Sequence, residues 1–181
     1  FLYIDLLTQI IFLLYFIIVF FYSTPSFFKN FDLRSYGGLK IFIVAFVWTL
    51  VTYLSLISNM NFIYEFSYII FGIQRFVFVF VLTIPFDIRD TKTDKIELKT
   101  IPQILGIFKS KLLGISLLII NTTIFYFTDK ISLIFILVEV FIYIILSIIL
   151  VISNSKKHLN FTRFWVEGIP IIWFIILFIL K

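Results

Sequence analysis

Long apolar stretches alternate with short polar loops along the chain. A helix of roughly 20 apolar residues crosses a hydrocarbon core of about 30 Å. Six stretches have that length and composition: 1–22, 41–58, 62–85, 112–128, 131–152 and 164–180. Runs such as IIFLLYFIIVFF do not alternate between apolar and polar residues, so they do not fit the strands of a membrane barrel. The pattern predicts one all-α domain over residues 1–181, a polytopic transmembrane helix bundle with six spans.

The composition agrees with this prediction. The chain is 62% hydrophobic and 14% charged, with a mean hydropathy of +1.15, whereas soluble domains are about 45–50% apolar and about 25% charged. We therefore expect the lipid bilayer to be its solvent. Cysteine is absent and His158 is the single histidine, which excludes disulfides and thiolate sites and argues against multi-histidine metal centres.

The basic residues are distributed unevenly over the loops. Three, six and three of the 15 Lys and Arg residues fall in the alternate loops 23–40, 86–111 and 153–163. The positive-inside rule places such loops in the cytoplasm. We expect an integral protein of the bacterial inner (cytoplasmic) membrane that binds the bilayer and no nucleic acid; the sequence does not indicate its oligomeric state.

The segment PFDIRDTKTDKIELKTIP gathers carboxylates at the end of the third span. Proline fits the first turn of a helix better than its interior, so we expect Pro85 to end that span or to begin a new turn. If 86–98 is helical, Asp87, Asp90 and Asp94 share one face. Their repulsion favours a bound Mg²⁺, which one or two carboxylates usually hold together with phosphate oxygens. The alternative is a solvated helix of mixed charge at the membrane border.

Two charged side chains fall inside predicted spans, Arg75 in the third and Glu139 in the fifth. Charges within a membrane are costly and are usually paired or functional. We predict that these two residues form a structural intramembrane pair.

The string PFDIRDTKTDKIELKTIPQILG resembles the second aspartate-rich motif of the UbiA superfamily of intramembrane prenyltransferases, with "RD…D" followed by Thr-Ile-Pro and a glycine. It departs from the family where Glu97, Leu98 and Lys99 replace a frequent glycine before the threonine. YSTPSFFK, ahead of GLK, is similar to a cytoplasmic loop of the family. The resemblance implies metal binding by Asp87, Asp90 and Asp94, and diphosphate binding by a second set of residues: Tyr22, Lys29, Arg89 and Lys95.

The family's earlier N-D-x-x-D-x-x-x-D motif does not occur in this chain. The resemblance therefore implies that the six spans are the last six of nine, and that this portion alone is inactive. It implies that the intact protein transfers a prenyl group from an isoprenyl diphosphate to a hydrophobic or aromatic, quinone-type acceptor with Mg²⁺ as cofactor. The alternatives are a small transporter subunit, for which the paired Gly/Pro interruptions of broken helices are missing, and a non-catalytic membrane protein.

Overall fold

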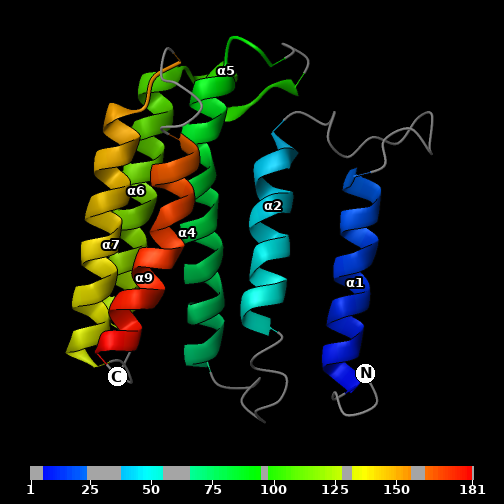
Figure 1. The fold of residues 1–181 in the computed structure, drawn as a ribbon, viewed down its shortest axis with the longest axis vertical. Coiled ribbons are helices and arrows are strands. Elements are labelled where there is room, and N and C mark those ends of the chain that lie inside the picture. Colours follow the sequence, from blue (N-terminus) through cyan, green and yellow to red (C-terminus); the bar gives the residue numbers. More distant parts are fainter. Residues whose placement is uncertain are drawn as a thin grey trace. The chain divides into compact units, whose positions relative to one another are not determined.

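The computed structural model describes residues 6–23, 38–54, 66–94, 98–127, 132–155 and 162–180. All regular elements within these ranges are helices, as predicted (Figure 1). In chain order they are α1 (Leu6–Ser23), α2 (Leu39–Thr49), the π-helix η1 (Leu50–Leu54), α4 (Phe66–Asp90), α5 (Ile101–Leu105), α6 (Ile107–Tyr126), α7 (Leu133–Ile152), the π-helix η3 (Thr162–Val166) and α9 (Glu167–Ile179).

The chain divides into two compact units. Unit 1 comprises Phe1–Phe80 with Glu97–Lys99, and unit 2 comprises Val81–Ile96 with Thr100–Lys181. Helix α4 therefore contributes its first part to unit 1 and its last part to unit 2. The single domain expected from the sequence stays a prediction.

In unit 1, helix α2 contacts both α1 and the first part of α4. Helix α1 packs against α2 and η1, and the ring of Phe42 on α2 lies 5.0 Å from the ring of Phe80 on α4. Gly38 precedes α2 with a φ of 75°, a left-handed conformation that favours glycine. Its N–H donates a 3.1 Å hydrogen bond to the carbonyl of Leu98, which ties the start of α2 to a later segment of the chain.

Unit 2 contains the polar end of α4 together with α5, α6, α7, η3 and α9. Helix α7 packs against both α6 and α9, and α5 packs against α6 (Figure 1). Gly114 of α6 faces Ile84 of α4 and Leu150 of α7, so the absence of a side chain lets the three helices approach closely. The apolar core of unit 2 also includes Ile88, Leu118, Ile142, Leu146, Val166 and Ile169.

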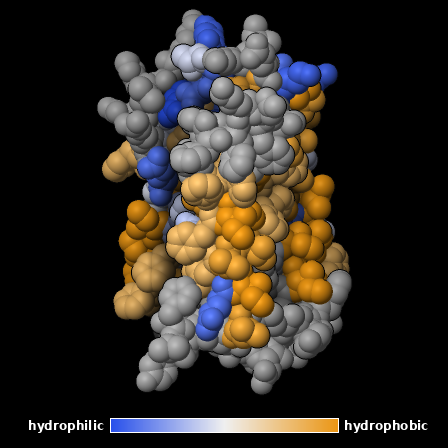
Figure 2. Space-filling model, turned by 90° about the vertical axis from the view of Figure 1, so that its right-hand side faces the viewer, coloured by the Kyte–Doolittle hydropathy of each residue, from blue (hydrophilic) through white to orange (hydrophobic). Residues whose placement is uncertain are grey.

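Three helical segments are long and apolar enough to cross a membrane: Ile69–Asp90, Ile107–Tyr126 and Leu133–Ile152. Gln9–Tyr22, Leu39–Thr52 and Phe164–Ile179 are shorter apolar helices. The exposed side of α7 carries Phe135, Phe141 and Ile148, so the outward face of this helix is apolar, as is typical of a membrane span. Figure 2 shows that hydrophobic residues are widely exposed on the face drawn there. Membrane character is thus supported, whereas the number of six spans stays a prediction.

The expected helix boundary at Pro85 is wrong. Pro85 is buried inside α4, which continues for another turn and ends at Asp90. Membrane helices tolerate proline because neighbouring groups can satisfy the backbone carbonyl that it leaves without a donor. Residues that follow the proline therefore decide where this helix ends.

Candidate functional site

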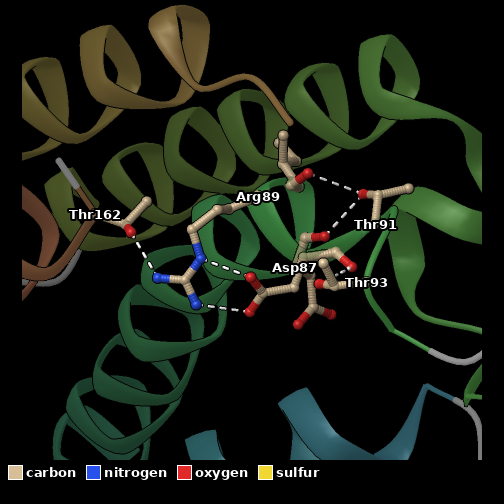
Figure 3. Close-up of polar contacts among 7 residues, drawn as sticks. Asp87, Arg89, Thr91, Thr93 and Thr162 are labelled. Carbon is tan, nitrogen blue, oxygen red and sulfur yellow. Dashed lines mark hydrogen bonds and ion pairs between the residues drawn. The ribbon is translucent and has the colours of Figure 1, made fainter. Parts of the chain in front are cut away.

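Two threonines end α4 and form the turn after it. The hydroxyl of Thr91 donates to the carbonyls of Asp87 at 2.8 Å and Ile88 at 2.9 Å. The Asp90 carbonyl accepts the backbone N–H groups of Thr93 at 2.9 Å and Asp94 at 2.8 Å, and also the Thr93 hydroxyl at 3.1 Å. Threonine side chains that bond nearby carbonyls compete with a continuing helix, so the backbone turns here (Figure 3).

This turn corrects the expectation of a helix from Phe86 to Leu98. Asp87 and Asp90 lie on the last turn of α4, but Asp94 lies in a bend beyond it. The three carboxylates are therefore not presented on a single helical face. Repulsion among like charges at helical spacing also disfavours the longer helix.

Arg89 is held from several directions at the end of α4. Its Nε and Nη2 each donate to one carboxylate oxygen of Asp90 at 2.6 Å, which makes a bidentate ion pair between adjacent residues. Its Nη1 donates to the hydroxyl of Thr162 at 2.7 Å, and its Cζ lies 5.4 Å from the centre of the Phe86 ring. Figure 3 shows the guanidinium between Thr162 and the carboxylate, so the end of α4 is tied to the start of η3.

The three carboxylates have different surroundings. Asp87 is 2% exposed, and Asp90 is engaged by Arg89. Asp94 Oδ2 is buried and makes no hydrogen bond within the part of the chain that the structure describes. Asp94 and Glu167 both lie near enough for their charges to act on Arg89.

Gln103 braces the turn that carries Asp94. Its Nε2 donates to the Asp94 carbonyl at 3.3 Å, and its Oε1 accepts the N–H of Thr100 at 3.0 Å. The side chain thus links the bend after α4 to the beginning of α5, and Asp94 has a backbone fixed on both sides.

The described residues contain no group of three or more His, Cys, Asp or Glu side chains that could hold a metal ion. A centre made by protein ligands alone is therefore not formed among them. A Mg²⁺ ion that shares its ligands with a substrate needs only one or two carboxylates. The buried Asp94 oxygen, which has no hydrogen bond among the described residues, fits that role, because buried polar atoms in folded proteins nearly always have a partner.

The structure brings together only part of the predicted site. Asp87, Arg89, Asp90 and Asp94 lie in unit 2, whereas Tyr22 is half-buried at the end of α1 in unit 1. Lys29 and Lys95 lie outside the described residues.

The intramembrane pair also stays a prediction. Arg75 belongs to unit 1, whereas Glu139, which is 1% exposed, belongs to unit 2.

Sequence reasoning missed Thr162 and Glu167. Thr162 contacts Arg89, which precedes it by 73 residues in the sequence. No spacing or motif in the sequence indicates such a contact. Glu167 is the first residue of α9, a common place for an acidic residue because of the helix dipole. Neither residue could have been assigned to the site from its sequence context.

Comparisons of the chain with protein-family models, with curated proteins and with solved structures find no match. The resemblance to the UbiA superfamily therefore rests on the quoted motifs alone.

Proposed function

We propose that the intact protein transfers a prenyl group from an isoprenyl diphosphate to a hydrophobic, aromatic acceptor of the quinone type within the membrane. The observation that carries this proposal is the polar end of α4. There, Arg89 and Asp90 end a segment long and apolar enough to cross a membrane, and Asp94 lies just beyond it. A charged headgroup and an apolar tail both find a matching environment at such a border.

At this end of α4, the acidic residues would bind the cation and the basic residues would bind the phosphates. Asp94 and Asp90 would hold Mg²⁺, and Asp87 would add negative charge from a buried position. When bound, the ion neutralises charge on the departing diphosphate. Arg89 would bind phosphate oxygens, since a guanidinium matches their geometry. Tyr22, Lys29 and Lys95 belong to the same proposed set through the resemblance.

The proposal includes a membrane arrangement. The three long segments, joined by the shorter apolar helices of α1, α2 and α9, would make six spans, the last six of nine. The basic loops would place the aspartates on the cytoplasmic side of a bacterial inner membrane. Lipid-facing helices would accommodate the isoprenoid tail.

The experiment is prenyl transfer by the intact protein in lipid, with isoprenyl diphosphates of several lengths, a set of aromatic acceptors, and either Mg²⁺ or EDTA. Product is detected by its gain of the prenyl mass. We expect Mg²⁺-dependent product that falls at least about 10²-fold in Asp90→Asn and Asp94→Asn, because each removes a charge that acts on the leaving group.

Lys92→Gln is the matched control, since Lys92 lies between the two aspartates and is exposed. It should keep most of the activity. Unchanged activity in both aspartate variants would defeat their assigned roles. Absence of Mg²⁺-dependent transfer with every donor and acceptor would defeat the proposed function.

A further inference from the structure

Thr162 begins η3 and is buried, with 1% of its surface exposed. Its hydroxyl accepts the 2.7 Å hydrogen bond from Arg89 Nη1. We propose that Thr162 is a positioning residue, which fixes the Arg89 guanidinium for binding a diphosphate. This inference rests on the function proposed above and adds to it a residue from the far end of the chain.

The contacts around Arg89 restrict both its position and its plane. Asp90 engages one edge of the guanidinium through Nε and Nη2, and Thr162 engages Nη1 on another. A long side chain loses rotamer freedom when it binds a ligand. Because Arg89 is already held, less freedom remains to be lost, and this favours tighter binding. Thr162 is the only described partner of Arg89 in these hydrogen bonds that lies outside α4.

Arg89 keeps donors for a ligand while these contacts hold. Arginine carries five N–H donors, one on Nε and two on each Nη. The contacts with Asp90 and Thr162 use one N–H on each nitrogen. Within the described residues, a second N–H on Nη1 and on Nη2 is left for phosphate oxygens. Arg89 can therefore bind an anion without leaving either protein partner.

The charges nearby determine which anion is expected. Asp90 already neutralises Arg89 in the ion pair, and Asp94 adds negative charge close to the guanidinium. A diphosphate alone would meet repulsion here. We expect it to bind together with a divalent cation, which also satisfies the buried oxygen of Asp94.

The test separates positioning from simple structural support. Thr162→Val keeps the shape of the side chain and removes the hydroxyl, whereas Thr162→Ser keeps the hydroxyl. The intact protein is titrated by calorimetry with inorganic diphosphate in excess Mg²⁺, so no turnover is needed. We expect Thr162→Ser to bind like the wild type, and Thr162→Val to bind about tenfold more weakly through the loss of one charge-assisted hydrogen bond.

A double-mutant cycle tests whether the affinity lost in Thr162→Val is lost through Arg89. In an Arg89→Gln background, Thr162→Val should cause no further loss of affinity, because its effect acts through the arginine. Additive losses, wild-type affinity of Thr162→Val, or equal weakening by Thr162→Ser would each overturn the inference. If Thr162→Val does not fold, Thr162→Ala takes its place.

The two proposals fail in different ways. If the wild type binds magnesium diphosphate and Thr162→Val binds it equally well, only the role of Thr162 is overturned. If the wild type binds no magnesium diphosphate, both proposals are overturned.

Discussion

Asn121 of α6 and Tyr143 of α7 are joined by a hydrogen bond of 2.8 Å from the asparagine Nδ2 to the tyrosine hydroxyl. Both residues are 4% exposed. In lipid, the association of helices depends on close packing and on interhelical hydrogen bonds, because the hydrophobic effect does not distinguish a neighbouring helix from a lipid tail. This bond is therefore a specific tie between the two helices that form the centre of unit 2.

Tyr143→Phe removes the acceptor and should lower the free energy of unfolding by about 1 kcal/mol, the range measured for such bonds in membranes. Reversible unfolding in mixed micelles of increasing denaturing detergent measures the change. Tyr126→Phe is the control, since Tyr126 lies exposed at the end of α6. Equal stabilities of the two variants would contradict the role given to the buried bond.

Gly114→Ala should lower the free energy of unfolding by about 1–3 kcal/mol, the usual effect of overpacking. A Cβ at Gly114 would lie 3.0 Å from Leu150 Cδ1 and 3.2 Å from Ile84 Cδ1. Gly168→Ala in α9 is the matched control, because its Cβ would meet nothing within 4 Å. There the loss of backbone freedom in the unfolded chain should leave stability equal or raise it by up to about 1 kcal/mol. If Gly168→Ala lowered the free energy of unfolding more than Gly114→Ala does, α4, α6 and α7 would not pack closely at Gly114.

Lys111→Met should destabilise unit 2 by about 1 kcal/mol. Lys111 Nζ donates a 2.6 Å hydrogen bond to the carbonyl of Val151, near the end of α7. The last carbonyls of a helix lack intrahelical donors, and a nearby cation also complements the helix dipole. Lys109→Met, two residues earlier and exposed, changes the same charge without removing this bond. Thermal unfolding of both variants should show a lower midpoint for Lys111→Met alone.

Sequence pattern locates the helices well where apolar residues run without interruption. The stretch 131–152 appears as α7 at Leu133–Ile152, because in lipid its apolar residues need no polar face. The pattern fails at the border of α4, where proline is tolerated inside the helix. The threonine hydroxyls of Thr91 and Thr93 then end that helix at Asp90, beyond the boundary expected at Pro85 but short of the helix expected to reach Leu98.

The candidate site is predictable only in its local part. The grouping of Arg89, Asp90 and Asp94 follows from their nearness in sequence, which also allows the ion pair between adjacent residues. The contact with Thr162 depends on how η3 packs against the end of α4. The periodicity of a single helix does not indicate which residues of two helices come into contact. A residue such as Thr162 can therefore be identified only in the folded structure.

Asp94→Ala should leave the free energy of unfolding unchanged or raise it by less than about 1 kcal/mol when no ligand is present. The substitution removes a buried oxygen that has no hydrogen bond among the described residues, and this gain offsets the lost attraction between Asp94 and Arg89. Thermal unfolding in EDTA measures the effect. A marked loss of stability would indicate that Asp94 serves the fold and not a ligand.

We propose that the end of α4 holds a magnesium-bound diphosphate. The most direct test of this claim is binding of an unreactive isoprenyl diphosphate analogue to the intact protein, measured by calorimetry with Mg²⁺ and with EDTA. We predict that binding requires Mg²⁺ and weakens at least about tenfold in Asp94→Asn but not in Lys92→Gln, since Asp94, unlike Lys92, would supply the cation with a ligand. Binding that is equal in EDTA, or that is unaffected by Asp94→Asn, would contradict the claim.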